Sequence, residues 1–257
     1  MVLNKIYMIP HGDEIIDMPD DDSVKMNNII REICEKDISE VLVILSPHGI
    51  NLSKHIGIVN TERFLSDTQL KEIHLNEYWK NERNLCEKII HSSGEIGEEV
   101  RFVTYSGDLS VFPMDFGTSI PLYFFKKRNM VMIGQSRSLD RESLMDFGKI
   151  LGETVSKYEK TVSVIFSADQ AHTHSKNGPY GFSPQADIYE EIVKESIEKM
   201  DFRKLENINM DVVGEAKPDS YWNLLIMDGL LKYSGLKMQF HFGYVAEYFG
   251  MMFASSN

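Results

Sequence analysis

The stretch Lys5–Gly12, KIYMIPHG, decides the fold of this chain, and Val41–Gly49, VLVILSPHG, repeats its plan. Each begins with a short apolar run that contains β-branched residues, which is typical of a buried strand. Each ends on Pro-His-Gly. Proline restricts the residue before it to extended conformations, and glycine after the histidine permits a sharp turn. The two stretches therefore predict two equivalent strand ends that hold His11 and His48 at fixed angles.

The segment between these strands carries helical periodicity from Ser23 to Ile33, and Ser23 is the expected N-cap. Strand, helix and strand in this order are typical of a layered α/β domain. Further strands are expected at Arg101–Tyr105, Met130–Ile133 and Thr161–Phe166, and further helices at 67–90, 140–158, 184–200 and 220–233. No linker separates two halves. We therefore predict one α/β domain over residues 1–257, with a central, mostly parallel or mixed sheet flanked by helices.

Composition limits the partners of the chain. A formal net charge of −12 disfavours nucleic acid and anionic membranes, and a small neutral or weakly acidic ligand fits better. The N-terminus lacks the pattern of a signal peptide, and no apolar run approaches the roughly 20 residues of a membrane span. Cys34 and Cys86 lie outside any CxxC motif, as free thiols in a reducing compartment do. These features predict a cytoplasmic protein.

A third histidine-bearing segment follows the strand expected at Thr161–Phe166. It contains His172 and His174, and the turn-rich loop after it contains Tyr180, whose hydroxyl group is available to a ligand. Ligands of open α/β sheets bind outside the carboxyl ends of the strands. A lone histidine at a strand end is more often structural, but three such strand ends favour one shared site.

Two carboxylates, Glu215 and Asp219, precede the helix that carries Trp222. Acids at such a position more often interact with the helix dipole. Combined with two histidines, however, one carboxylate completes the facial triad that is typical of non-haem Fe(II) oxygenases. Spacing alone leaves the choice between the two acids open.

At these residues the chain resembles the class III extradiol dioxygenases, the family of the protocatechuate 4,5-dioxygenase catalytic subunit. The resemblance spans nearly the whole chain, and its motifs occur in the order Pro10–Gly12, Ser46–Gly49, Asp115–Leu122, Ser167–His174 and Gly178–Gly181. It implies that His11 and His48 are iron ligands and that His172 is the acid/base histidine. His174 is expected to assist His172 or to orient the substrate, and Tyr180 is expected to contribute its hydroxyl group.

The resemblance also guides the choice of the third ligand. The family places its carboxylate shortly before a helix with a bulky residue and a Gly-Ala-Leu-like end, so Glu215 is preferred and Asp219 is the close rival. One departure stands out at Phe116, where many members have histidine. Phenylalanine cannot hydrogen-bond a substrate oxygen, which argues against protocatechuate-like specificity.

The function implied by the resemblance is non-haem Fe(II)-dependent extradiol cleavage of a catecholic ring, with a small aromatic diol and O2 as substrates. The same fold includes dopa dioxygenases and Memo-like proteins, so two alternatives stay open: a Zn(II)-dependent hydrolase that uses the same ligands, and a non-catalytic Memo-like interaction protein. The apolar stretch Tyr248–Ala254 is expected to lie in the core or between the copies of a homo-oligomer.

Overall fold

The computed structural model describes residues 2–257, and its main feature is one sheet of eight strands. In chain order these strands are β1 (Leu3–Ile9), β2 (Val41–Ser46), β3 (Ile56–Asn60), β6 (Gly97–Arg101), β8 (Asn129–Gly134), β9 (Val162–Ser167), β10 (Met238–Ala246) and β11 (Phe249–Ser256). Their order across the sheet is β10-β11-β1-β9-β2-β8-β3-β6. A small second sheet has the order β5-β4-β7 and contains β4 (Arg63–Gln69), β5 (His74–Lys80) and β7 (Val111–Pro113).

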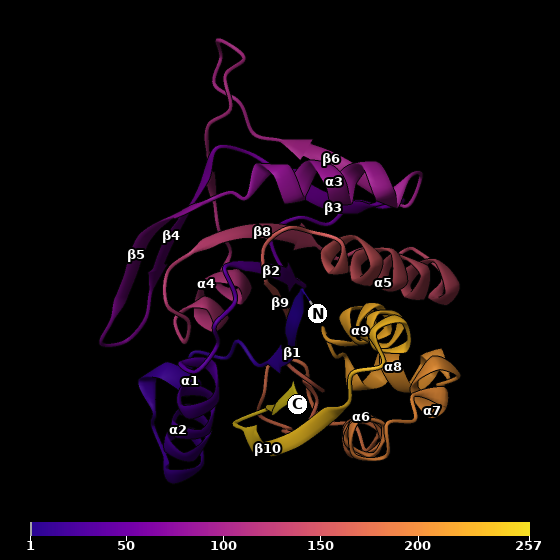
Figure 1. Ribbon diagram of the computed structural model, residues 1–257. Coiled ribbons are helices and arrows are strands. Elements are labelled where there is room, and N and C mark those ends of the chain that lie inside the picture. The colour runs from indigo at the N-terminus through magenta and orange to yellow at the C-terminus, as the bar shows by residue number, and fades with distance from the viewer. Residues whose placement is uncertain (1) are drawn as a thin grey trace.

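Helices cover both faces of the large sheet. They are α1 (Glu14–Asp17), α2 (Asp21–Cys34), α3 (Arg83–Ser93), α4 (Phe116–Leu122), α5 (Arg141–Ser156), α6 (Gln185–Lys199), α7 (Arg203–Glu206), α8 (Met210–Ala216) and α9 (Tyr221–Ser234). Figure 1 shows α5, α8 and α9 on one side of the central strands and α1, α2 and α4 on the other. The predicted class, an α/β fold with a mixed sheet between helices, is confirmed.

The centre of the sheet is parallel, because β1, β9, β2 and β8 pair side by side in the same direction. The register places Ser167, the last residue of β9, opposite Ile9 of β1, and Phe166 opposite Leu45 of β2. The loops after β1, β9 and β2 therefore leave neighbouring strands at one edge of the sheet. This arrangement brings the three histidine-bearing segments together.

Alternation along the strands builds one core on each face of the sheet. In β1, Ile6 and Met8 join the core beneath α5 and α9, whereas Tyr7 and Ile9 join the core beneath α2 and α4. The two large helices α5 and α9 approach very closely at Gly148, where a Cβ atom would collide with the carbonyl oxygen of Ile226. Glycine is required there for the packing of the helices rather than for a turn.

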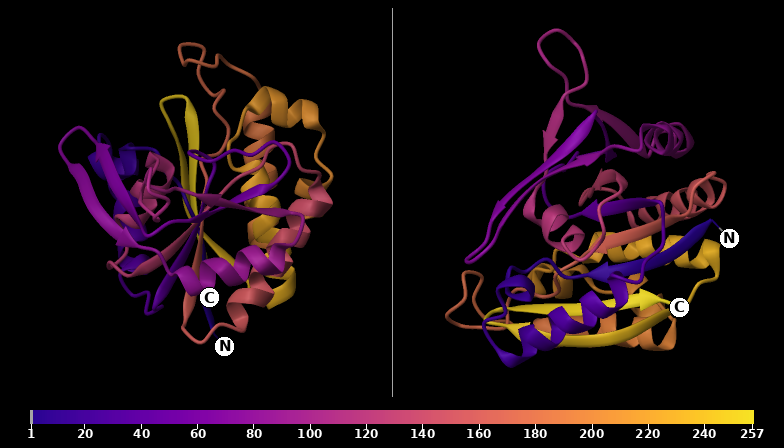
Figure 2. Two further views of the ribbon diagram at one scale, coloured as in Figure 1. Left: turned by 90° about the horizontal axis from the view of Figure 1, so that it is seen from above. Right: turned by 60° about the vertical axis from the view of Figure 1, so that its left-hand side comes forward.

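Three local predictions were wrong. Helix α2 is capped by Asp20, whose side chain accepts from Ser23 N at 2.8 Å, so Ser23 is the third residue of a capping box and not the N-cap. The helix expected at 67–90 is instead the end of β4, then β5, and then α3. The strand expected at 101–105 ends at Arg101, and Figure 2 shows the following segment projecting from the body.

The failure at 67–90 has a physical reason. In β5 only Trp79 is buried, and most other residues of this strand are exposed. Apolar and polar residues alternate along a strand when one of its faces is buried. This ribbon contacts solvent on most of its surface, so its sequence does not show that alternation. Helical spacing then fits the few apolar residues equally well.

The apolar stretch at Tyr248–Ala254 belongs to the core. Most of it forms β11, which lies between β10 and β1 and is buried along its whole length. Tyr248 and Phe249, at the start of this stretch, instead reach the edge where the histidines meet. Within residues 2–257 no helix is both long enough and apolar enough to cross a bilayer.

Candidate metal centre

Three potential ligand atoms meet at the carboxyl edge of the parallel strands. His11 Nε2 lies 3.1 Å from His48 Nε2 and 3.1 Å from Asp219 Oδ2, and His48 Nε2 lies 3.4 Å from the same carboxylate oxygen. His11 follows β1, His48 follows β2, and Asp219 comes just before α9. At metal–ligand distances of about 2.1 Å, ligand atoms of one ion lie about 3 to 3.5 Å apart, so the three atoms are spaced as a divalent cation requires.

The hydrogen bonds of His11 also fit a metal ligand. Ser167 Oγ donates to the carbonyl oxygen of Gly117 at 2.5 Å, so it accepts the bond from His11 Nδ1, which lies 2.8 Å away. The proton of the neutral ring is therefore on Nδ1, and Nε2 presents its lone pair to His48 and Asp219. Metal-bound histidines have such a partner on the other ring nitrogen, which fixes the tautomer and the orientation of the ring.

His48 is held by the start of α4. Asp115 accepts from Ser46 Oγ at 2.6 Å and from the backbone N–H of Thr118 at 3.0 Å. Gly49, with φ of +76°, turns the chain beside this carboxylate, and a Cβ there would lie 2.7 Å from Asp115 Oδ2. The glycine after the second histidine thus serves both a left-handed turn and a close approach.

Phe116 covers the two histidine rings. Its ring centroid lies 4.3 Å from that of His48 and 5.6 Å from that of His11. The position that departs from the family pattern is therefore part of the site, and it supplies an apolar wall instead of a hydrogen-bond donor.

Negative charge from carboxylates dominates the surroundings of His11. Burial alone would lower the pKa of His11, but the charges of Asp169 and Asp219 outweigh burial and raise this pKa to about 9. Burial likewise opposes the charged form of Asp219, yet its interactions with His11 and His48 hold the pKa of this carboxyl below its usual range. Burial raises the pKa of Asp169, which stands next to Asp219. A metal ion held between these side chains would balance this negative charge.

Sequence reasoning did not single out Asp169 or Ser167. Asp169 accepts from the backbone N–H of His11 at 2.9 Å, and its other oxygen lies 3.4 Å from His11 Nε2. The available signal was position, because Ser167 is the last residue of β9 and Asp169 follows two residues later, in the same run as His172. The prediction used the strand-end position for histidines alone. Serine and aspartate residues at strand ends lie at the same edge of the sheet and can join the same site.

His172 lies beside the candidate metal ligands. Its Nδ1 donates to the carbonyl oxygen of Lys217 at 2.9 Å, which leaves Nε2 free to accept a proton. A ring nitrogen of His172 lies within 4.8 Å of carboxylate oxygens of Asp169 and Asp219. The imidazole stacks on Phe249 with the ring centroids 5.7 Å apart and an angle of 15° between the planes.

Of the other three predicted site residues, one lies near the site and two face away from it. Tyr180 is half-exposed and lies near His172, with 5.8 Å between the ring centroids. His174 turns away, and its Nε2 lies 2.7 Å from Glu190 Oε1 in α6. Glu215, the preferred carboxylate, is exposed and accepts from Ser183 Oγ at 2.9 Å. Asp219, the rival acid, and not the preferred Glu215, therefore faces the histidines.

Two cavities meet at this group and share the walls His48, His172, Tyr180 and Asp219. We call the first, of about 600 Å³, the acidic cavity, since carboxyl groups of Asp13, Glu14, Asp169 and Glu247 line it. We call the second, of about 430 Å³, the basic cavity, since Arg137 and Lys217 line it. Either volume accommodates a single aromatic ring with its substituents.

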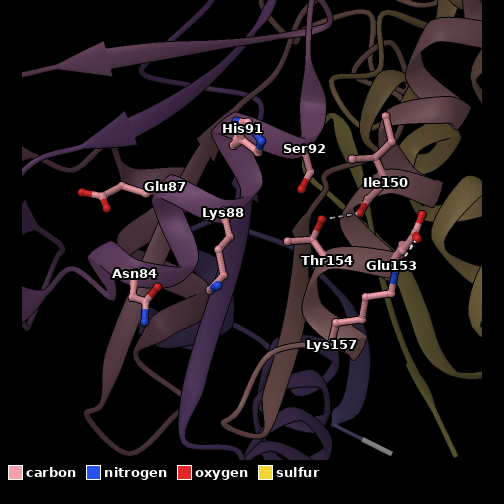
Figure 3. Close-up of a pocket in the computed structure, with 9 residues that line it drawn as sticks. All are labelled: Asn84, Glu87, Lys88, His91, Ser92, Ile150, Glu153, Thr154 and Lys157. Carbon is pink, nitrogen blue, oxygen red and sulfur yellow. Dashed lines mark hydrogen bonds and ion pairs between the residues drawn. The ribbon is translucent and has the colours of Figure 1, made fainter.

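A further cavity of about 680 Å³ lies between α3 and α5 and shares no residue with the site (Figure 3). Two bonds in its wall lie within α5 and its end: Lys157 pairs with Glu153 at 2.6 Å, and Thr154 donates to the carbonyl oxygen of Ile150 at 2.8 Å. The group of two histidines and an aspartate lies elsewhere, at the strand ends.

The fold and the site define an α/β protein with two histidines and one aspartate grouped at the carboxyl edge of a parallel sheet. Residues 5–253 match the family described as the catalytic LigB subunit of aromatic ring-opening dioxygenase, and the chain belongs to this family. The expected resemblance is thereby confirmed over nearly the whole chain. Metal-binding groups are typical of the family, in agreement with the group described above.

Two relatives extend this comparison. Protein CA_C1420 of Clostridium acetobutylicum is 24% identical over 250 residues, which cover 90% of this chain and 53% of that protein. The chain therefore spans about half the length of this curated relative. In fold the chain is similar to the crystal structure of the uncharacterized protein JW3007 from Escherichia coli K12, with a TM-score of 0.68, 14% identity and 98% coverage of each chain.

Proposed function

We propose that this protein is a non-haem Fe(II)-dependent dioxygenase that opens a catecholic ring outside the diol pair with O2. One observation carries the proposal: His11, His48 and Asp219 group their ligand atoms in the same cavity that receives the free nitrogen of His172. A metal group next to a base serves reactions in which a bound diol must lose a proton. Membership in the ring-opening dioxygenase family supports this reaction over others.

His11, His48 and Asp219 are the residues that would hold the ion. Two neutral imidazoles and one carboxylate suit Fe(II) and leave open positions on one face. When bound, the ion supplies a positively charged centre that brings catechol oxygens and dioxygen together and stabilises the charge moving between them. Asp219 is the one anionic ligand, so the ion and its three ligands together would carry one positive charge, which attracts a catecholate.

His172 would act as the acid and base of the reaction. Its Nε2 accepts a proton from a diol hydroxyl, while the bond from Nδ1 to the Lys217 carbonyl keeps the ring in that tautomer. An imidazole can both take up a proton at this nitrogen and return it later in the reaction. Phe249, stacked on the ring, fixes its plane and excludes water from one face.

Aromatic side chains would hold the substrate ring. Phe116 lies over the metal ligands, and Tyr180 lies between the two cavities. Offset or edge-on contacts between aromatic rings contribute about 0.5–1.5 kcal/mol each. Phe116 makes no hydrogen bond to the diol, so orientation depends on the metal group and on His172.

The test is reconstitution of the protein with Fe(II) without air, followed by a panel of catechols and O2. We expect a yellow ring-opened product and the uptake of one O2 per catechol. The matched control is the Zn(II)-loaded protein, which should bind catechol but form no such product. Hydrolysis of esters by the Zn(II) form, with an inert Fe(II) form, would favour the hydrolase alternative. Retained metal without product from any catechol would favour the non-catalytic alternative.

A further inference from the structure

Asp169 and Asp219 form a pair of buried carboxylates at the edge of the sheet. Their residues are only 3% and 5% exposed. The backbone N–H of Asp169 donates to Asp219 Oδ1 at 3.1 Å, and the backbone N–H of Ser220 donates to the carbonyl oxygen of Asp169 at 3.2 Å. These bonds between the two segments hold the acidic side chains next to each other.

Neither carboxylate pairs with a lysine or an arginine. Among the described residues, the basic nitrogens within 4.0 Å of the two acids belong only to His11 and His48. Buried carboxylates are costly unless positive charge or hydrogen bonds compensate them. An ion held by His11, His48 and Asp219 would use the lone pair of His11 Nε2, so this nitrogen would donate nothing to Asp169. That carboxylate would then have no positively charged side chain beside it.

His172 faces the pair of acids with its free ring nitrogen. Its Nδ1 donates to the carbonyl oxygen of Lys217 at 2.9 Å, and metal-bound histidines have such a partner on the other nitrogen. A ring nitrogen of His172 and one oxygen from each acid lie within 4.8 Å of one another, yet the ring forms no ion pair within 4.0 Å. Ligands on opposite sides of an ion lie about 4.2 Å apart at bond lengths of about 2.1 Å. The separation therefore suits an intervening cation.

The acidic cavity supplies the charge that attracts such a cation. Carboxyl groups of Asp13, Glu14, Asp169 and Glu247 line it, and no lysine or arginine does so among the described residues. Glu14 Oε2 is buried without a hydrogen-bond partner. One divalent ion compensated by Asp219 adds a single positive charge, so the cavity stays negative after the first ion is bound.

We propose that Asp169, His172 and Asp219 form a second divalent-cation site, which shares Asp219 with the first. Asp169 is grouped with His172 and not with His48, so the two ions lie on different sides of Asp219. The ions of two-metal sites lie about 3.5–4 Å apart, a distance that one bridging carboxylate spans. Imidazole and carboxylate ligands suit Zn(II).

Occupation of the second site would inhibit the proposed reaction. The second ion takes the lone pair of His172 Nε2, the atom that the proposed function assigns to the diol proton. Only this consequence rests on the proposed function, because the site itself follows from the side chains. Ring opening should therefore decline when divalent metal is in excess.

The experiment counts the Zn(II) ions that bind the metal-free protein, with calorimetry as the measurement. We expect two ions per chain, and the second should bind more weakly because the two cations repel each other. Asp169→Asn and His172→Gln should each lose the second ion and keep the first. Asp169→Asn retains an oxygen for the backbone N–H of His11. Asp219→Asn should weaken the binding of both ions, as a shared ligand requires.

The matched control is His174→Gln. It removes the other imidazole of the same segment, which lies 2.7 Å from Glu190 and lines neither cavity. Both ions should remain in this variant. Loss of the second ion here would assign that ion to the surface of α6 and would overturn the inference.

A spectroscopic readout in the unmodified protein does not depend on the folding of a variant. Two Co(II) ions that share a carboxylate at about 3.5–4 Å couple magnetically. The second equivalent of Co(II) should therefore reduce the paramagnetic resonance signal per ion, whereas separate sites would give signals that add. In the Fe(II)-loaded protein, Zn(II) should lower the rate of ring opening at unchanged iron content, and Asp169→Asn should resist this inhibition.

Three further results would overturn the inference: one ion per chain in the unmodified protein, a second ion that survives both Asp169→Asn and His172→Gln, or Co(II) signals that add. In each of these the first ion still binds, so the proposed function stands. If the Fe(II)-loaded protein opens no catechol, the proposed function fails, and the count of ions still tests the second site by itself.

Discussion

Two segments close the site, 167–174 and 215–219, and each carries two candidates of the same chemistry. In the first, His172 faces the cavities while His174 faces Glu190. In the second, Asp219 faces the histidines of the metal group while Glu215 faces Ser183. The difference shows that residue type and neighbourhood in sequence do not decide which member of a pair reaches the site.

Backbone contacts between the two segments make the selection. His172 N donates to the carbonyl oxygen of Ala216 at 2.8 Å, and Asp169 N donates to Asp219 Oδ1 at 3.1 Å. The two segments are thereby aligned side by side. In this arrangement His172 lines both cavities and Asp219 faces the histidines, while His174 bonds Glu190 and Glu215 bonds Ser183.

The largest expected effect tests the pair of acids. Asp219→Ala should lower metal affinity by more than about 100-fold, because losing a ligand exceeds the 10–100-fold effect of losing a hydrogen-bond partner of a ligand. Glu215→Ala should retain the metal. Metal content after anaerobic reconstitution and desalting measures both. Retention by the first variant and loss by the second would restore Glu215 as the ligand.

The pair of histidines comes next. His172→Ala should keep the metal and lose about 10²–10⁴ in turnover, the usual contribution of general acid–base catalysis. His174→Ala should keep most of its turnover, since its ring contacts α6 and lines neither cavity. Initial rates of O2 uptake with metal-loaded variants decide the point. Equal losses in both variants would contradict the division between the two residues.

A smaller effect concerns the support of His11. Ser167→Ala removes the acceptor of His11 Nδ1 and should weaken metal binding about 10–100-fold without abolishing it. Competition with a chelator measures the change. Ser92→Ala, on the exposed face of α3, is the control and should bind metal normally. Unchanged affinity in Ser167→Ala would mean that the orientation of His11 does not depend on this bond.

The smallest expected effect is a pH dependence of stability, and it concerns His174, whose ring faces away from the site. Burial lowers the pKa of His174, but the bond and charge of Glu190 outweigh burial and raise it. Because the folded pKa exceeds the unfolded value of about 6.5, this stabilisation is complete below about pH 6.5 and is lost as pH rises through the folded pKa.

The thermal-unfolding midpoint of the unmodified protein should therefore exceed that of His174→Gln by about 2–4 °C at pH 6, equivalent to roughly 1 kcal/mol, and the gap should narrow at higher pH. Glu190→Gln should reduce the pH dependence of this gap to the smaller part that Asp187, 3.4 Å from His174 Nδ1, contributes. A gap that widens with rising pH would contradict the ion pair.

The positions of His11, His48 and His172 could be predicted because they depend on local signals. A buried strand followed by Pro-His-Gly predicts both where the strand ends and that a histidine lies at its end. Parallel strands bring such ends to one edge of the sheet. The β4–β5 ribbon could not be predicted from the alternation of apolar and polar residues. Few of its residues are buried, and exposed positions do not need to be apolar at regular intervals.

The sequence by itself determined the class of fold, the family, and the placement of two histidines directly after β1 and β2. Each of these follows from short contiguous motifs. Only the tertiary structure decided that Asp219 completes the group, that His174 and Glu215 turn away, and that Arg137 and Lys217 border the same cavity. These outcomes depend on contacts between segments far apart in the chain. The direction of a side chain near a helix end is set by those contacts and not by local residue preference.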